Sequence, residues 1–428
     1  MKLRGGVGVA AAGSLAVRSG VFRYRGAAGM LRRHGLATAV GLAALRAPDR
    51  TVLVRALDSM TGRELDAALG ATAAAMRERW PGGGRVAVRG DGGIDFFVVL
   101  AAAGIAGLDA VAVGPRSSPP ADLESVHAWD VFVREGGLAA SPRRRTTGSV
   151  QLLSTGTTGT PSVTARGRLG IRQMLQLADA DRRLRMPAGS VLVLAPPDHG
   201  HGLSMVLAGL TRGRTVILAS GMRPAEQAEA AARHGVTTIS GVPAQLGRLW
   251  DDDPSAFDGV RLVVSGSSKL PATLRAQLEA GGARVLDCYG STETGTVAID
   301  GRPLAGVTID VDGDQRILIT SPLGGRRRDP GDLGHVERGR LVVDGRHGDL
   351  VDIGGELLSP EHIADALRAV PGVVAARVWP EPDDLLGSRL CAEVTVSDPA
   401  IDAAALTHEL TRRVGRAAVP RHFVVSRE

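Results

Sequence analysis

The chain has 428 residues, of which 44% are hydrophobic and 3% aromatic, so it can bury a large aliphatic core and exceeds the usual length of one compact domain. The net charge of +6 is concentrated at the N-terminus, because residues 1–50 contain nine Lys or Arg and one Asp, whereas the other 378 residues sum to −2. The main body therefore lacks the basic surface that nucleic-acid binding requires. Two cysteines, Cys288 and Cys391, imply no disulfide framework and fit a reducing cytoplasm.

Residues 1–46 are expected to form a basic N-terminal extension. Its apolar run, Val7 to Val17, follows Lys2 and Arg4 and has the outline of a secretory signal, but it lacks a clean cleavage site and is too short to span a bilayer. A second interpretation is a partly amphipathic segment that contacts a membrane surface, which would make a cytoplasmic protein membrane-associated. A third is a disordered or locally packed extension.

Residues 47–344 have the pattern of an α/β domain. Thr61 and Glu64 in "TGREL" form a predicted capping box before a helix that ends near Trp80. Short β-branched runs then alternate with helical stretches, which predicts mostly parallel sheets covered by helices. The strands are expected in 85–91, 190–197, 214–220, 235–243, 259–268 and 283–293, and the helices in 93–107, 223–235 and 271–282.

The pattern changes after Gly301. Residues 306–321 and 339–355 read as antiparallel hairpins, which we expect to add a small β-barrel-like part to the large domain. Residues 345–428 then predict a small α+β domain that begins near Gly345. Its expected order is a helix in 359–370, strands in 373–381 and 390–396, a helix in 402–417 and a last strand in 421–426.

A glycine- and hydroxyl-rich loop, "STGTTGTPS" (154–162), follows a predicted strand. Backbone amides and Thr hydroxyls in such a loop can surround a polyphosphate, although no Gly-Lys-Ser/Thr follows as in a Walker loop. Taken alone, the segment could equally be a surface linker. Another strand end, "CYGSTETG" (288–295), presents Tyr289, Thr292 and Glu293, and "PGDLG" (330–334) supplies Asp332 near the domain boundary. Ligands bind at such strand ends in parallel α/β folds.

The order of six motifs resembles the adenylate-forming (AMP-binding) superfamily, which includes acyl-CoA synthetases. The motifs are "STGTTGTP", "APPDHGHG", "VVSGSSKL", "YGSTE", "GDLG" and "GRHGDLVDIGGELLSPEHI". The last resembles the long-chain fatty acid or aryl ligase end of the superfamily. The resemblance implies that ATP activates a carboxylic acid, expected to be a fatty acid, as an acyl-adenylate, and that coenzyme A then takes the acyl group. Amide and hydroxyl donors with Mg²⁺ would stabilise the pentavalent phosphorus.

The resemblance also implies a role for each motif residue. Thr292, Glu293 and His199 would be catalytic, with Thr292 on the α-phosphate, Glu293 on Mg²⁺ and His199 at the mouth of the acyl pocket. Tyr289 would stack on adenine and Asp332 would accept from the ribose hydroxyls. The remaining nucleotide- and cofactor-binding residues would be Thr155, Gly156, Thr157, Thr158 and Gly159 at the β and γ phosphates, Gly266 and Ser267 beside adenine, Arg346 at the ribose and Gly355 on the thiol path.

Some motif residues have other interpretations. The segment "DHGHG" could be a His-x-His metal pair of His199 and His201, but further ligands are not evident. Cys288 reads as a small buried residue, and Lys269 as a solvated turn cation rather than a base.

The sequence also departs from the superfamily. Lysine occurs only at Lys2 and Lys269, and the chain stops at Glu428, before the Gly-Lys segment whose lysine serves adenylation in the superfamily. The expectation is a C-terminally truncated ligase in which adenylation is impaired. An alternative is a pseudoenzyme that binds a nucleotide or acyl-adenylate and has a regulatory or scaffolding role.

Overall fold

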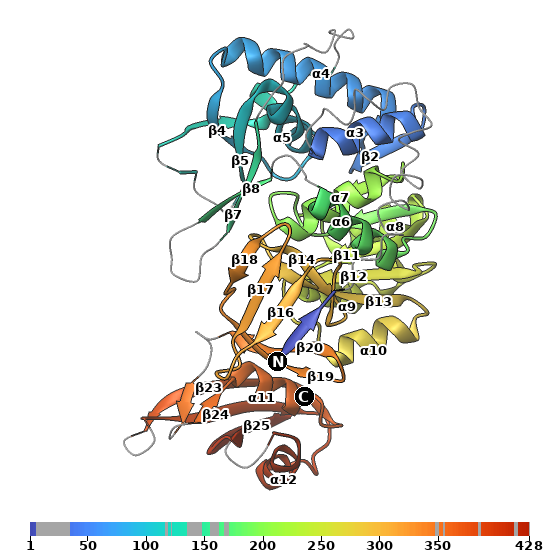
Figure 1. The fold of residues 1–428 in the computed structure, drawn as a ribbon. Coiled ribbons are helices and arrows are strands. Elements are labelled where there is room, and N and C mark those ends of the chain that lie inside the picture. The colour runs from blue at the N-terminus through green and yellow to red at the C-terminus, as the bar shows by residue number, and fades with distance from the viewer. Residues whose placement is uncertain are drawn as a thin grey trace.

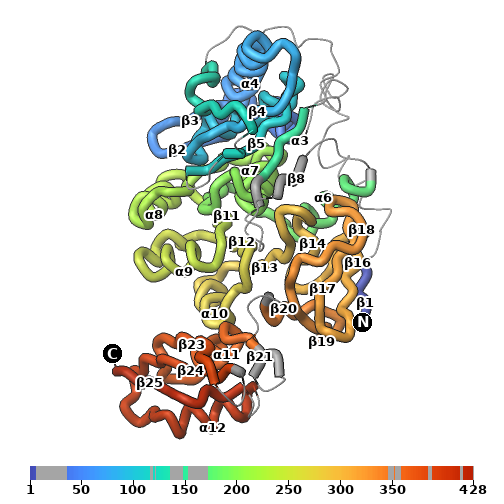
Figure 2. Tube along the Cα trace, turned by 90° about the vertical axis from the view of Figure 1, so that its left-hand side faces the viewer, coloured from blue at the N-terminus to red at the C-terminus, as the bar shows by residue number. Residues whose placement is uncertain are grey.

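The computed structural model describes residues 1–5, 35–115, 119–120, 122–134, 148–154, 162–166, 171–346, 351–353, 356–383, 387–414 and 418–427. Figure 1 shows a large α/β domain with the C-terminal residues forming a separate small domain below it. Figure 2, turned by 90°, shows the same separation. The expected fold class, a large domain of helix-covered sheets and a small α+β domain, is confirmed.

The largest sheet in the described residues has nine strands, and its inner strands run parallel as predicted. Alternate residues of these strands face opposite sides: Val191 belongs to one core cluster and Leu192 to the other. Both faces are therefore buried, which explains the nearly continuous Val, Leu and Ile runs. In spatial order the strands are β15 (Arg302–Pro303), β14 (Gly295–Ile299), β13 (Arg284–Ser291), β12 (Leu262–Gly266), β11 (Val236–Gly241), β9 (Ser190–Val193), β10 (Val216–Leu218), β2 (Thr51–Arg55) and β3 (Asp58–Thr61).

Helices pack on both faces of this sheet. Side chains of α8 (Pro224–Arg233), α9 (Pro243–Asp252) and α10 (Ala272–Ala280) share one core cluster with Leu192. The opposite cluster, with Val191, includes residues of α7 (Gly200–Leu210). A further helix, α6 (Ile171–Leu184), contacts the sheet through β14.

A second sheet of five strands forms the upper part of Figure 1. Its order is β6 (Glu124–His127), β4 (Gly84–Arg89), β5 (Leu108–Val113), β7 (Val150–Ser154) and β8 (Ser162–Arg166). The helix α5 (Ile94–Ala106) is apolar all round because Phe96, Phe97 and Leu100 are fully buried. The helix α4 (Gly62–Arg79) begins at the predicted capping box: the Glu64 amide donates to Thr61 Oγ1, and the Thr61 amide donates to Glu64 Oε2.

Two parts of the expected 1–46 extension belong to the large domain. The helix α3 (Gly35–Arg46) packs Leu36, Val40 and Ala43 into the main core, and β1 (Lys2–Arg4) joins an antiparallel sheet. At these two segments the extension is locally packed, in line with the third interpretation, because tertiary contacts fix them. Residues 6–34, including Val7 to Val17, lie outside the described residues. Among the described residues, no helix is both long enough and apolar enough to cross a membrane.

The antiparallel part of the large domain is a four-stranded sheet with an adjoining hairpin. The sheet has the order β1, β16 (Thr308–Val311), β17 (Ile317–Ser321) and β18 (Gly325–Arg328). The hairpin consists of β19 (Asp332–Glu337) and β20 (Arg340–Arg346), and a bridge between Arg316 and Leu333 connects it to the segment before β17. This arrangement corresponds to the small β-barrel-like part predicted after Gly301.

The small domain has its own core. Ile363 and Leu367 from its first helix pack with Leu390 and Leu406. One ion pair joins it to the large domain: Lys269 Nζ lies 3.5 Å from Asp365 Oδ2, so Lys269 is not simply a solvated cation. The elements are β21 (Val351–Ile353), β22 (Glu356–Leu358), α11 (Pro360–Arg368), β23 (Val373–Asp383), β24 (Gly387–Val396), α12 (Ala403–Val414) and β25 (His422–Arg427).

Candidate nucleotide site

The candidate site lies where β12 and β13 end side by side. These strands are parallel neighbours, and Gly266 at the end of β12 is paired with Cys288 in β13. Tyr289 is the next residue of β13, so it lies one position beyond the Gly266–Cys288 pair. The Tyr289 hydroxyl donates to Asp332 Oδ2 at 2.7 Å, and Asp332 is only 9% exposed. The motifs "SGSS", "YGSTE" and "GDLG", which are far apart in the sequence, meet at one edge of the sheet.

Thr292 and Glu293 occupy the tight turn between β13 and the antiparallel strand β14. Thr294, which is buried, fixes this turn: its Oγ1 accepts the Ser291 amide at 3.0 Å, and its own amide donates to Ser291 Oγ at 3.2 Å. Gly290 is required where the strands approach, since a Cβ there would lie 2.0 Å from the Gly295 carbonyl oxygen. The turn thus brings Thr292 and Glu293 to the end of the sheet.

The N-terminus of α7 faces the same turn. A Cβ on Gly200, its first residue, would lie 3.8 Å from Thr292 Cα. The amides at a helix N-terminus attract anions, so this end of α7 favours a phosphate or carboxylate beside Thr292. His199 is the N-cap residue of α7, and its side chain is 63% exposed. The structure therefore brings His199 close to the Thr292 turn.

Asp198 adjoins His199 but is buried. Its Oδ2 lies 3.5 Å from His199 Nδ1, and a Cβ on Gly114 would lie 2.0 Å from the same Oδ2. The other oxygen, Oδ1, is buried and has no hydrogen-bond partner among the described residues, and burial raises the pKa of Asp198. This burial could not be predicted from the motif, because Gly114 directly follows β5 of the other sheet.

His201 occupies different surroundings from His199. His201 is partly buried, its Nε2 lies 2.9 Å from Ser240 Oγ, and the loss of solvent around the ring lowers its pKa to about 4. The alternative metal pair of His199 and His201 has no further support, since the described residues include no group of three His, Cys, Asp or Glu side chains that could hold a metal ion. The contact with Ser240, which is 39 residues away, could not be predicted from the motif.

Several predicted site residues cannot be placed fully. Arg346 pairs through its backbone with Asp332 across β19 and β20, but its side chain is outside the described part of the structure. Ser267 is exposed at the end of β12 with a φ of 73°, a strained left-handed conformation for a residue with a side chain. The loop residues Thr155, Gly156, Thr157, Thr158 and Gly159, together with Gly355, lie outside the described residues.

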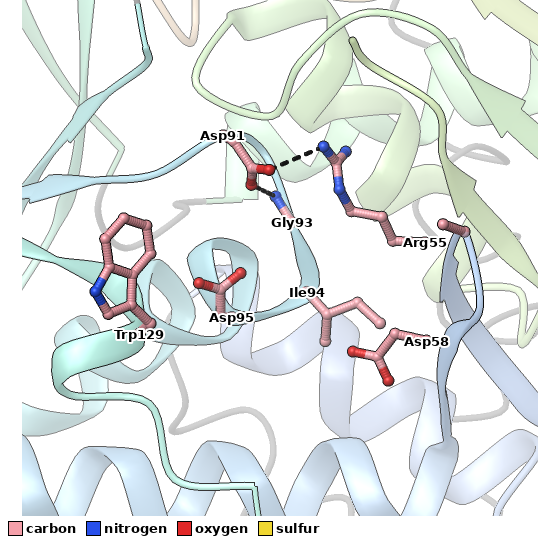
Figure 3. A pocket seen from close by; sticks show the side chains of 8 residues that line it. Arg55, Asp58, Asp91, Gly93, Ile94, Asp95 and Trp129 are labelled. Atoms are coloured by element: carbon pink, nitrogen blue, oxygen red, sulfur yellow. Dashed lines mark hydrogen bonds and ion pairs between the residues drawn. The ribbon is translucent and has the colours of Figure 1, made fainter. Parts of the chain in front are cut away.

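A separate hollow of about 340 Å³ lies near the start of α5 and does not include the motif residues. Figure 3 shows Arg55 and Asp91 facing each other across it, with Asp95 near Trp129. Arg55 forms a 3.1 Å ion pair with Asp91 and also donates to the Ser220 carbonyl oxygen. Asp58 is paired with Arg134. Because these charges are largely paired with one another, the hollow offers less to a nucleotide than the strand ends do.

Comparison with known proteins identifies relatives of this chain. Residues 142–347 match the family model described as AMP-binding enzyme. A sulfoacetate–CoA ligase of Cupriavidus necator is 29% identical over 321 residues, which cover 64% of this chain and 62% of the relative. A probable 2-succinylbenzoate–CoA ligase of Mycobacterium tuberculosis is 30% identical over 265 residues, which cover 55% of this chain and 69% of the relative. The match thus spans roughly two thirds of each relative's length.

Solved structures have the same fold. An o-succinylbenzoate CoA synthetase of Bacillus subtilis, solved with its acyl-adenylate intermediate, superimposes with a TM-score of 0.71 at 19% identity. The match covers 90% of this chain and 94% of that protein. Both domains of this chain are therefore within the likeness.

Proposed function

Because the chain belongs to the AMP-binding enzyme family, we propose that it uses ATP to activate a carboxylic acid as an acyl-adenylate and passes the acyl group to coenzyme A. The observation that supports this most strongly is the hydrogen bond between Tyr289 and Asp332 beside Gly266, with the Thr292 turn and the N-terminus of α7 adjoining them. A ring, a buried carboxylate and anion-binding groups match a nucleotide's base, sugar and phosphates.

In this proposal the sugar and base bind between β12 and β19. A carboxylate offers about four acceptor positions, so Asp332 can hold the Tyr289 hydroxyl and accept from the ribose hydroxyls. The Tyr289 ring would stack on adenine, with Gly266 and Ser267 at its border. Arg346, whose backbone is paired with Asp332, would reach the ribose.

The phosphates would bind where Thr292 faces the α7 N-terminus. Thr292 would donate to the α-phosphate, and the loop Thr155–Gly159 would hold the β and γ phosphates. Glu293 would bind Mg²⁺, an assignment that fits because Mg²⁺ commonly takes one or two protein carboxylates and completes its shell with phosphates and water. The bound ion would neutralise charge on the pyrophosphate leaving group.

The acid substrate would approach from the side of His199. The carboxylate oxygen attacks the α-phosphorus, and pyrophosphate leaves with the bonding electrons. The named relatives act on sulfoacetate and 2-succinylbenzoate, so they do not favour the long-chain fatty acid that "GGELLSP" suggests. We therefore propose a carboxylic acid that carries a second functional group. The relatives also give no support to a pseudoenzyme.

Coenzyme A is the proposed acceptor, and Gly355 in the segment 354–360 is the proposed thiol path. Membrane contact through the basic N-terminus rests on composition alone and stays a prediction, as does a cytoplasmic location.

Calorimetry with AMP tests the proposed nucleotide site. Wild type should bind AMP, and Asp332→Ala should weaken binding at least about tenfold, because hydrogen bonds to a charged group contribute about 1.5–3 kcal/mol. Asp310→Ala is the matched control, since Asp310 lies on β16 and forms an ion pair with Lys2 of β1. Equal AMP affinity in wild type and Asp332→Ala would place the nucleotide elsewhere.

A further inference from the structure

The imidazole of His201 lies next to Gly266, which borders adenine in the proposed site. It projects from the second residue of α7 to the ends of two strands of the large sheet, β11 and β12. Its Nε2 meets Ser240 Oγ of β11 at 2.9 Å. On the β12 side, a Cβ added to Gly266 would lie only 2.5 Å from its Nδ1. One partly buried ring thus connects α7, β11 and β12.

The neutral form of the ring satisfies these contacts. Burial lowers the pKa of His201 to about 4, and a hydrogen bond with the backbone of Val264 opposes this lowering only in part. A neutral imidazole has one donor and one acceptor nitrogen. With Nδ1–H toward Val264, Nε2 accepts from the Ser240 hydroxyl, so both ring nitrogens have a partner.

The contact with Gly266 makes the ring a support for the strand end. Gly266 is buried and does not have a positive φ, so its backbone conformation would accept alanine. The three atoms nearest to an added Cβ all belong to the His201 ring. Glycine is therefore required at 266 because of His201, and the ring fixes how far the end of β12 can shift toward α7.

We propose that His201 is a positioning residue of the nucleotide site, which holds Gly266 and Ser267 at the height where adenine binds. The inference rests on the proposed function, because it assigns a role at the same site. It also separates the two histidines of "DHGHG": His199 is exposed beside the Thr292 turn, whereas His201 acts through the β12 backbone and does not touch the reacting groups.

A double-mutant cycle read by AMP calorimetry tests this role. His201→Ala should weaken AMP binding about tenfold, the scale expected when a buried hydrogen-bond partner is lost. Gly266→Ala should weaken it comparably, because its methyl group would clash with the ring. In the double variant the clash is gone, so Gly266→Ala should add little to the loss caused by His201→Ala.

Two milder variants guard against simple unfolding. His201→Gln keeps an amide that can partner Ser240, and it should bind AMP more tightly than His201→Ala does. Ile239→Val is the stability control: it removes one methyl group from β11 in the opposite core cluster, so it should lower stability without changing AMP affinity. Circular dichroism should show all variants folded.

The outcomes separate this inference from the proposed function. If wild type fails to bind AMP, both the proposed nucleotide site and the role of His201 are refuted. If wild type binds AMP but His201→Ala binds it equally well, the positioning role alone is overturned. Fully additive losses in the double variant would also overturn it, because they would mean that ring and strand end act independently.

Discussion

At the scale of single residues, the Tyr289 side chain has two separable parts. Its ring is the proposed stacking surface for the base, and its hydroxyl donates to the buried carboxylate of Asp332. Tyr289→Phe keeps the ring and should weaken AMP binding about three- to tenfold, since a hydrogen bond contributes about 1 kcal/mol and more when one partner is charged. Tyr289→Ala should weaken it further. Calorimetric affinities that are equal for the two variants would contradict stacking on the ring.

Asp287 makes the stability of this region depend on pH. Burial and the nearby Asp300 raise its pKa to about 6, although Arg275 and the Leu270 backbone oppose the shift. Because the folded-state pKa lies above the unfolded value, the folded protein binds the extra proton between about pH 4 and 6, so this residue's contribution to stability falls as pH rises through that window.

Asp287→Asn should therefore stabilise the protein at pH 8 relative to wild type, by about 1–3 kcal/mol, and the gain should disappear near pH 4. Asparagine keeps an oxygen that can accept the Leu270 amide. Urea unfolding at pH 4.5, 6 and 8 measures the difference, and an advantage that is constant across these values would refute the raised pKa. Asp252→Asn is a suitable control, because Asp252 is an exposed residue in a surface ion pair.

Among the elements, β4, β9, β10, β11, β12 and β13 could be predicted because each is a short β-branched run next to a helical stretch. The elements β1 and α3 show why others could not be predicted. The strand β1 has three residues and no pattern of its own, and exists through its pairing with β16. The helix α3 is rich in Ala and Gly within a basic stretch, and its position depends on the core that Leu36 and Val40 enter.

The candidate site, too, could be predicted only in part from the sequence. The motifs identified Tyr289, Thr292, Glu293 and Asp332, and the structure brings Tyr289 and Asp332 into contact. The contact between His201 and Gly266 could not be predicted, because the two residues are 65 positions apart in the sequence and meet only in the fold.

The capping box of α4 provides a prediction at this scale. Thr61→Ala removes the hydroxyl that accepts the Glu64 amide and should lower the free energy of unfolding by about 1 kcal/mol. Urea unfolding measures this change. Thr61→Ser keeps the hydroxyl and should cost much less. If serine and alanine were equally destabilising, the loss would come from the methyl group rather than from the cap.

In the whole molecule, the proposed nucleotide site belongs to the large domain, and the small domain contacts the turn beside it. Lys269, three residues beyond Gly266, forms the 3.5 Å ion pair with Asp365 of α11. Both side chains are partly exposed, so the pair contributes little to stability. Its position nevertheless joins the turn that borders the proposed adenine site to the small domain that supplies the proposed thiol path.

Acid-dependent exchange of labelled pyrophosphate into ATP tests whether the chain forms an acyl-adenylate. The acids should include sulfoacetate, 2-succinylbenzoate and laurate, with Mg²⁺ present. We predict exchange with at least one acid that carries a second functional group, and a loss of about 100-fold or more in Glu293→Gln, the scale seen when one transition-state charge stabiliser is removed. Glu337 is an exposed residue of β19, and Glu337→Gln should retain full exchange. Exchange that needs no acid, exchange with none of the acids, or full exchange in Glu293→Gln would contradict the account.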